Sequence, residues 1–193
     1  MTETVPPAYP FLVLLVSGGH TQLVLALSPD KFSILADTLD NKIGQGPFYY
    51  KIRAIADRAS DVFDKAARLL DLPSSTQASG AVIEHYASLP PLAPFNTHPS
   101  VALATALPDK SRIAFSFSGI LTATARRIEE FRPDVEEEAL KREVSRVFQE
   151  AVVGHLCTKV GHAVKLLSGQ GMAEAGGLVV SGGVASNQYL RQT

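Results

Sequence analysis

The sequence predicts an α/β fold, and three observations lead to that prediction. Short apolar runs that end in glycine turns occur near both ends of the chain, at 11–16 and 177–180. Between them, apolar residues recur with the 3.6-residue period of a helix, over 60–70 and again over 136–167. The length of 193 residues, with 46% hydrophobic and 19% charged residues, is enough for one sizeable core or two small lobes.

Three strands are expected in the first forty residues. The segment 11–16 is short and rich in Leu and Val, and it stops at Ser17-Gly18-Gly19, as a buried strand does at a tight turn. The segment 21–27 follows as a second strand, and 32–39 alternates loosely as a third. Short connections make these strands a meander, which is a suitable start for an α/β lobe.

The middle of the chain is expected to contain a helix, a loop and a further strand. Residues 60–70 have a helical period over about three turns. The segment 90–108 holds five prolines and no sustained period, so it is expected to be an ordered loop. Residues 112–117 return to the pattern of a strand.

The segment 136–167 carries a continuous apolar stripe. This stripe fits one long helix, or two helices with a bend near Gly154 or Gly161. His155 and His162 lie seven residues apart on roughly one face, which raises the possibility of a metal site. The favoured interpretation is that they are core or surface histidines, because no third ligand lies at a useful spacing.

Composition excludes some classes of protein. The net charge of −1 gives no global basic field, so any contact with RNA has to rely on a local patch. The single cysteine, Cys157, excludes an intrachain disulfide and a cysteine-based zinc site, and it is expected to be a buried apolar residue. No apolar run approaches the length of a membrane span, and the first ten residues resemble neither a signal peptide nor a transit peptide.

Two similar glycine turns indicate a nucleotide or phosphate site. The strand at 177–180 ends at Ser181-Gly182-Gly183, which repeats the Ser-Gly-Gly that follows the first strand. Glycines let the backbone present N–H groups closely to a phosphate, and two such turns suggest a nucleotide held from two sides. Ordinary tight turns remain the alternative. The P-loop, the G-x-G-x-x-G fingerprint and the G-x-S-x-G elbow are all absent from the sequence.

Five motifs resemble, in order and nearly in wording, those of the TsaD-type tRNA N6-adenosine threonylcarbamoyltransferases, formerly called Gcp-type O-sialoglycoprotein endopeptidases. They are LLVSGGHTQL at 14–23, VFDKAARLL at 62–70, SGAVIE at 79–84, FSFSGILTA at 115–123 and VSGGVASNQYLR at 180–191. The histidine in SGGHTQL and the phrase GGVASN are more similar to the bacterial and mitochondrial branch. The old endopeptidase label has no counterpart, since neither a zincin motif nor a serine-protease signature is present.

The resemblance implies an actin/Hsp70-like (ASKHA) fold of two ribonuclease-H-like lobes, of which this chain would be mostly the second. It implies transfer of a threonylcarbamoyl group from its adenylate to N6 of the adenosine beside the anticodon, in tRNAs that read ANN codons. Asp64 and Gly80 would hold the ribose, and Asn187 with Gly182-Gly183 would meet the adenine. The residues expected around the phosphate are Leu15, Val16, Ser17, Gly18 and Gly19.

The sequence also departs from the family pattern. The divalent metal of the family is expected on an H-x-x-x-H pair and a later aspartate, which this sequence does not contain, so no metal ligand and no catalytic residue is assigned here. Residues 45–60 interrupt the family pattern and are a suspected insertion or gene-model error. Ser79-Gly80-Ala81 replaces a glycine-glycine-proline turn, and Leu121 stands where a lysine is expected. Arg126 and Arg127 are candidate RNA contacts, although an exposed helix face is the favoured interpretation.

The leading hypothesis is one partial transferase domain over 1–193, with a strand meander at 8–44, the suspected insertion at 45–60, and helices and the second glycine turn at 61–193. By family branch it would be mitochondrial, with the cytoplasm as alternative, and its partners would be tRNA, an adenine nucleotide and a homodimer mate or accessory subunits. The main rival is a catalytically inactive nucleotide-binding paralogue or fragment. A sugar or acetate kinase is less favoured, because such enzymes need acidic residues on first-lobe strands.

Overall fold

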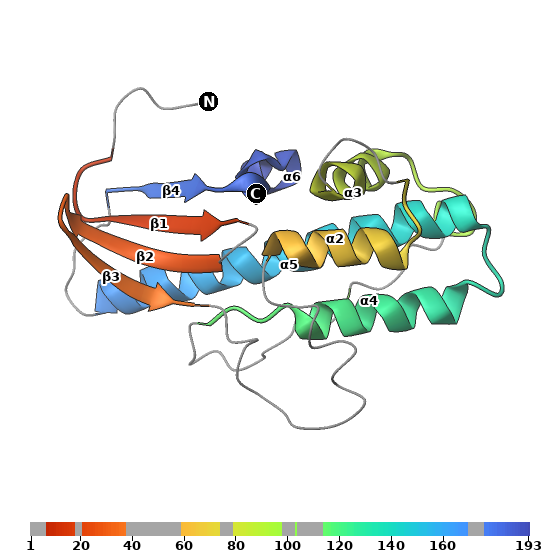
Figure 1. Ribbon diagram of the computed structural model, residues 1–193, viewed down its shortest axis with the longest axis horizontal. Helices are drawn as coiled ribbons and strands as arrows, with labels where there is room; N and C mark the ends of the chain where they lie inside the picture. The colour runs from red at the N-terminus through yellow and green to blue at the C-terminus, as the bar shows by residue number, and fades with distance from the viewer. Residues whose placement is uncertain are drawn as a thin grey trace.

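The computed structural model describes residues 7–17, 21–37, 59–73, 79–97, 103, 114–169 and 176–193, and the fold is that of these residues. A sheet occupies one end of an elongated molecule and most of the helices lie at the other end (Figure 1). The long helix α5 (Glu137–Gly169) runs from the sheet end to the helical end (Figure 1). The predicted α/β class is confirmed. None of the helices in these ranges combines the length and apolarity that crossing a bilayer requires.

The sheet has four strands in the order β3-β2-β1-β4. Neighbours among the first three strands are antiparallel, whereas β4 runs parallel to β1. The strands are β1 (Phe11–Val16), β2 (Thr21–Ser28), β3 (Lys31–Ala36) and β4 (Leu178–Ser181). The predicted meander is confirmed. Its third strand ends at Ala36, and residues 38–39 of the predicted strand lie outside the described residues.

Alternation along the strands explains which face of the sheet is buried. In β1, Leu12, Leu14 and Val16 are buried while the residues between them are only partly so. Successive side chains in a strand point to opposite faces, so the even positions of β1 pack into the core. Leu23 and Leu25 of β2 continue the buried face.

The helices surround and extend this core. They are α2 (Ala59–Leu69), α3 (Ser79–Ser88), α4 (Ser118–Phe131), α5 (Glu137–Gly169), the 3-10 helix η1 (Gly183–Ser186) and α6 (Gln188–Gln192). α5 is one unbroken helix of 33 residues, which settles the choice left open by Gly154 and Gly161. At 1.5 Å per residue it is roughly 50 Å long. It packs against α3, α4 and α6 and therefore supports elements from distant parts of the sequence.

In the middle of the chain one helix was not predicted and one predicted strand was wrong. Ser79-Gly80-Ala81, which replaces a turn of the family pattern, forms the start of α3. The expected strand at 112–117 is reduced, in its described part, to one bridge in which the Phe115 amide donates to the Asp37 carbonyl at 3.2 Å. Phe115 and Phe117 are both fully buried and stacked, so this segment fills the core instead of alternating between two environments.

Cys157 is exposed, which contradicts its expected burial. The apolar stripe of α5 passes through Leu156 and Ala163, which are fully buried, and Cys157 follows Leu156 by about 100° around the helix. Its side chain is therefore directed away from the packed face. Hydrophobicity alone did not distinguish this position from the neighbouring buried ones.

His155 is a hydrogen-bonded core histidine, as the favoured interpretation predicted. Its side chain is 2% exposed, and its Nε2 atom accepts a hydrogen bond from the Ser116 amide at 3.3 Å. The edges and faces of Phe115 and Phe117 meet its ring. Within the described ranges, no three His, Cys, Asp or Glu side chains come together in a group that could hold a metal ion.

The buried His155 should make the fold sensitive to acid. Burial, followed by the nearby Lys159 ammonium group, lowers the pKa of His155 from 6.5 to about 4. Between these values the unfolded chain binds a proton that the folded chain does not, so stability falls as pH falls from about 6.5 to 4. The integrated loss is about 3 kcal/mol.

Urea unfolding of wild type and His155→Gln at pH 7, 5.5 and 4 measures this loss. Glutamine retains an acceptor for the Ser116 amide but does not titrate. The stability advantage of wild type over the variant should therefore shrink towards pH 4 by about 3 kcal/mol. Parallel pH profiles for the two proteins would show that His155 does not cause the acid sensitivity.

Candidate nucleotide-binding site

The two Ser-Gly-Gly segments begin at the same edge of the sheet. Because β1 and β4 are parallel neighbours, with Leu15 paired to Ser181, their carboxyl ends lie together. In open α/β sheets, ligands bind just beyond the carboxyl ends of the strands. Leu15, Val16 and Ser17 thus lie beside the Gly182 turn. Gly18 and Gly19, which were also expected at this edge, lie outside the described residues.

Gly182 packs directly against the end of β1. It has a φ of 108° and a ψ of 174°, a region that essentially only glycine occupies. A Cβ atom at this position would lie 2.2 Å from the carbonyl oxygen of Val16 and 3.0 Å from the amide nitrogen of Ser17. Glycine is therefore required here both for its backbone conformation and for the close approach of the two strand ends.

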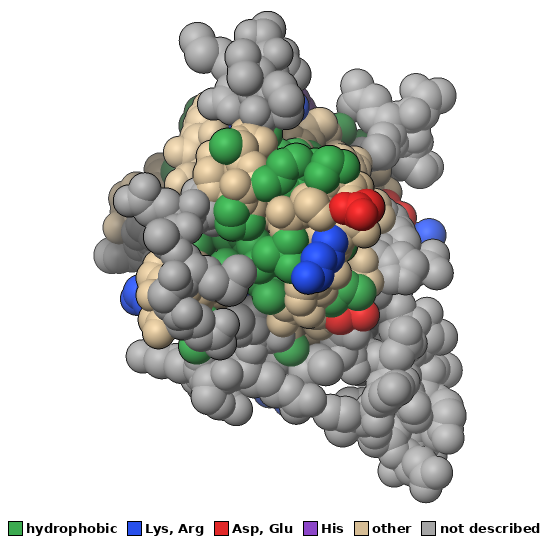
Figure 2. Space-filling model, turned by 90° about the vertical axis from the view of Figure 1, so that its left-hand side faces the viewer, with side chains coloured by type: hydrophobic (Ala, Val, Ile, Leu, Met, Phe, Trp, Pro, Cys, Tyr) green, Lys and Arg blue, Asp and Glu red, His purple; other side chains and the backbone are tan. Residues whose placement is uncertain are grey.

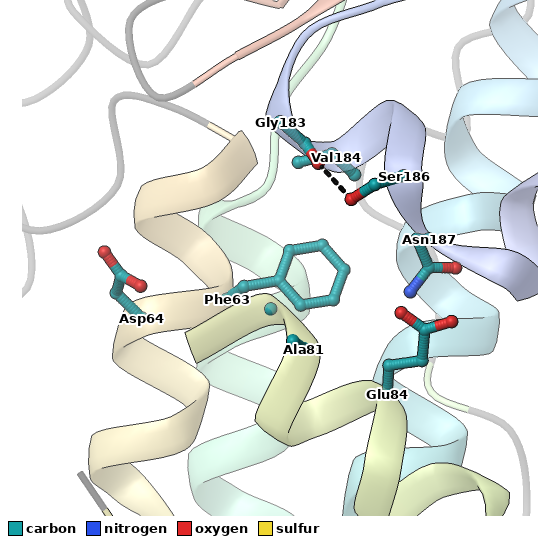
Figure 3. A pocket seen from close by; sticks show the side chains of 9 residues that line it. Phe63, Asp64, Ala81, Glu84, Gly183, Val184, Ser186 and Asn187 are labelled. Carbon is teal, nitrogen blue, oxygen red and sulfur yellow. Dashed lines mark hydrogen bonds between the residues drawn. The ribbon is translucent and has the colours of Figure 1, made fainter. Parts of the chain in front are cut away.

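A cavity of about 140 Å³ lies between α2, α3 and the η1–α6 segment (Figure 3). At about 30 Å³ for each water molecule, it has room for roughly five. The residues that line it are Phe63, Asp64, Gly80, Ala81, Glu84, Gly183, Val184, Ser186 and Asn187. The cavity thus unites four residues expected at the site from three separate sequence motifs, namely Asp64, Gly80, Gly183 and Asn187.

Asp64 lies on α2 at one side of the cavity and is partly exposed. In Figure 3 the Phe63 ring lies between the side chains of Asp64 and Glu84. A helix-surface carboxylate at this position could pair with Lys65 or Arg68. None of the ion pairs formed between described residues involves Asp64. The carboxylate of Asp64 is therefore placed to accept hydrogen bonds from hydroxyl groups of a ligand.

Asn187 is buried and caps α6. Its Oδ1 atom accepts a hydrogen bond from the Leu190 amide at 2.9 Å, as the N-cap of a helix does. Its Nδ2 atom donates to Oε1 of Gln149 on α5 at 2.8 Å. Asn187 is therefore the N-cap of α6, and its contact with adenine stays a prediction.

Glu84 lines the cavity, although the sequence assigned it no role. One of its carboxylate oxygens accepts a hydrogen bond from the Gln188 amide at 2.6 Å, which ties α3 to the N-terminus of α6. Gly80 and Glu84 are four residues apart and lie on one face of α3, close to the cavity. This spacing is a signal that sequence analysis could have used once the segment was known to be helical.

The remaining departures from the family pattern have structural counterparts. Leu121 stands where a lysine is expected. It lies in the core and is only 3% exposed, so this position of α4 faces away from solvent. Arg127 pairs with Glu130 at 3.3 Å and lies over the ring of Phe131, whereas Arg126 is exposed. Residues 45–58 of the suspected insertion lie outside the described residues.

Comparison with known proteins gives one consistent result. The family model described as TsaD, tRNA N6-adenosine threonylcarbamoyltransferase, matches residues 1–193. A curated tRNA N6-adenosine threonylcarbamoyltransferase from Buchnera aphidicola subsp. Baizongia pistaciae (strain Bp) is 33% identical over 191 residues. The match covers 99% of this chain and 46% of that protein. The chain therefore spans about half the length of the curated relative it matches.

Proposed function

Because the chain belongs to the TsaD family of tRNA N6-adenosine threonylcarbamoyltransferases, we propose that it contributes the adenylate-binding surface for threonylcarbamoyl transfer to tRNA. The acceptor is N6 of the adenosine next to the anticodon in tRNAs that read ANN codons. The donor is threonylcarbamoyl-adenylate. The family has the actin-like fold, and the resemblance implies that a nucleotide lies in a cleft of this fold.

One observation carries this proposal: Asp64, Gly80, Gly183 and Asn187 line a single cavity. They come from three motifs that lie between positions 62 and 191, and the fold brings them together. The ends of β1 and β4 pack together at Gly182, so their backbone groups lie at the edge of the sheet next to Gly183 of the cavity lining. This arrangement suits a nucleoside that lies against the cavity lining with only part of it inside, and a phosphate near the glycine turns.

The reaction needs a held adenylate and a positioned amine. The N6 nitrogen attacks the carbamoyl carbon, a C–N bond forms, the C–O bond to the phosphate breaks, and AMP leaves with the bonding electrons. The amine proton passes to solvent or to a neighbouring base. The chain's own groups would bind the adenylate and orient its carbonyl, because fixed geometry and backbone donors lower the barrier of such a transfer.

A divalent metal, which the family resemblance implies, would neutralise charge on the phosphate oxygens. The described residues do not fit that role, since no suitable group of ligands comes together among them. No step is therefore assigned to a metal here. The contribution of this chain is the binding and orientation of the nucleotide.

Replacing Asp64 with asparagine is expected to weaken binding of AMP, or of a non-reactive threonylcarbamoyl-adenylate analogue, by about 10- to 100-fold, because hydrogen bonds to a charged acceptor are lost. Isothermal titration calorimetry measures the change. Asp134→Asn is the matched control, since Asp134 is exposed and lies outside the cavity lining. Equal affinities of Asp64→Asn and wild type would remove Asp64 from the site.

A transfer assay separates the two candidate functions. Transfer of radiolabelled threonylcarbamoyl from the adenylate to an anticodon stem-loop containing the target adenosine would support the transferase. Nucleotide binding without transfer would favour the catalytically inactive paralogue or fragment instead. If the protein neither binds adenylate nor transfers the group, the proposed function is wrong for this chain.

A further inference from the structure

A buried hydrogen bond connects the cavity to the long helix α5. Gln149 is 6% exposed, and its Oε1 atom accepts from Nδ2 of Asn187 at 2.8 Å. The two residues are 38 positions apart in sequence. Gln149 itself is not among the cavity-lining residues, so its contact with the site runs through Asn187.

This hydrogen-bond network fixes which way the Asn187 amide points. The Leu190 amide can only donate, so the atom that faces it at 2.9 Å must be the oxygen of Asn187. The nitrogen of Asn187 must then face Gln149, and Gln149 must present its oxygen. The reverse orientation of either side chain would place two donors or two acceptors against each other.

The amide nitrogen of Asn187 carries two N–H groups, and the bond to Gln149 uses one of them. Figure 3 shows this nitrogen on the side of Asn187 that faces Glu84, within the group of side chains lining the cavity. Among the described residues, no hydrogen bond other than the one to Gln149 uses this nitrogen, so its second N–H group is a donor that a ligand beside Glu84 would meet. A ring nitrogen of a purine is an acceptor that would match it, whereas the exocyclic amine of adenine is a donor that would not.

The neighbouring residue of α5 supports the opposite wall. The Phe148 ring packs edge to face against Phe63, with centroids 5.2 Å apart and an interplanar angle of 86°. Both rings are at most 2% exposed. Consecutive residues of one continuous helix, Phe148 and Gln149, therefore hold the α2 side and the α6 side of the cavity.

We propose that Gln149 is a positioning residue that sets the Asn187 amide so that a hydrogen-bond donor faces the adenine base. The inference rests on the proposed function, because it assumes that the ligand is an adenylate. It adds two points, namely that Gln149 orients Asn187 and that Asn187 contacts an acceptor atom of the base. A bound adenylate would meet Asn187 through a ring nitrogen. Gln149 would not touch the nucleotide.

Variants at position 149 test this role. Gln149→Leu removes the acceptor and should weaken AMP binding about tenfold, whereas Gln149→Glu keeps an acceptor and should remain within about threefold of wild type. Gln149→Leu combined with Asn187→Ala should bind no more weakly than Asn187→Ala alone, because both changes remove the same contact. Gln149→Met, which offers only a weak sulfur acceptor, serves as a second variant if the leucine protein does not fold.

Ser145→Ala is the matched control. Ser145 lies one turn earlier on α5 and is fully buried, and its hydroxyl has no hydrogen-bond partner among the described residues. The control should bind AMP as wild type does. If it weakens AMP binding as much as Gln149→Leu, the effect comes from general disturbance of α5, and the positioning role is wrong.

Side-chain amide signals in NMR spectra give a readout that needs no ligand. In Gln149→Leu the Asn187 amide protons should shift or broaden, while Gln149→Glu should keep two resolved signals, because one N–H remains hydrogen-bonded. Unchanged Asn187 signals in Gln149→Leu would overturn the proposal. If wild type binds no AMP, the proposed function fails for this chain, and these signals alone decide whether Gln149 positions Asn187.

Discussion

Replacing Gly182 with alanine is expected to lower the free energy of unfolding by at least about 4 kcal/mol, enough to prevent folding of a marginally stable chain. The new Cβ would lie 2.2 Å from the Val16 carbonyl oxygen, which belongs to the backbone of β1 and cannot rotate away. The φ of 108° adds conformational strain for any residue with a side chain. Urea unfolding followed by circular dichroism measures the loss.

The adjacent glycine provides the matched control. A Cβ atom at Gly183 would meet no atom of the described residues within 4 Å, and Gly183 already belongs to the 3-10 helix η1. Gly183→Ala should therefore change stability by less than about 1 kcal/mol. Equal stability of the two variants would mean that the strand ends do not meet as closely as the structure shows.

The close contact at Gly182 also shows what the sequence could predict about the site. Repetition of Ser-Gly-Gly after two apolar strands indicated paired turns, and the structure places those strands side by side with Leu15 opposite Ser181. The strands themselves were predictable, because alternation and apolar runs are local signals. The parallel pairing of β1 with β4 was not, since it depends on how the whole chain between them folds.

The features that could not be predicted from the sequence depend on tertiary contacts. Within α3 only Val82 and Ile83 are buried, so the segment has no continuous apolar stripe to indicate a helix. The role of Glu84 depends on the Gln188 amide, which is 104 residues away in sequence. Likewise, Gln149 lies inside an apolar helix pattern, and only the position of Asn187 shows that it contacts a residue of the cavity.

The family motifs supplied information that spacing alone did not. From spacing alone, Asp64 could not be distinguished from a surface carboxylate, nor Gly80 from an ordinary glycine. Only the resemblance to the family assigned them to the site. Both line the cavity in the structure. A Cβ at Gly80 would lie 4.0 Å from Phe63, an ordinary contact distance, so glycine at this position is not required by packing. Close approach of a ligand would be one physical reason for glycine here.

Replacing Phe63 with alanine is expected to destabilise the fold by about 3–5 kcal/mol, because a buried aromatic side chain is lost and a cavity is left behind. Phe63 is 2% exposed and forms the edge-to-face pair with Phe148. The same substitution would open the wall between Asp64 and Glu84, so AMP binding should weaken as well. Chemical unfolding measures the loss of stability. Calorimetric titration with AMP, at a temperature below the unfolding midpoint of the variant, measures the loss of affinity.

Phe32→Ala is the control for loss of a phenylalanine, since Phe32 on β3 is 59% exposed. Phe32→Ala should lower the free energy of unfolding by less than about 1 kcal/mol, because most of the Phe32 ring is already in water. A double-mutant cycle between Phe63 and Phe148 should give a coupling of about 0.5–1.5 kcal/mol, the usual value for an aromatic pair. Additive losses would mean that the two rings contribute separately, and α5 would then not hold the α2 wall of the cavity through this pair.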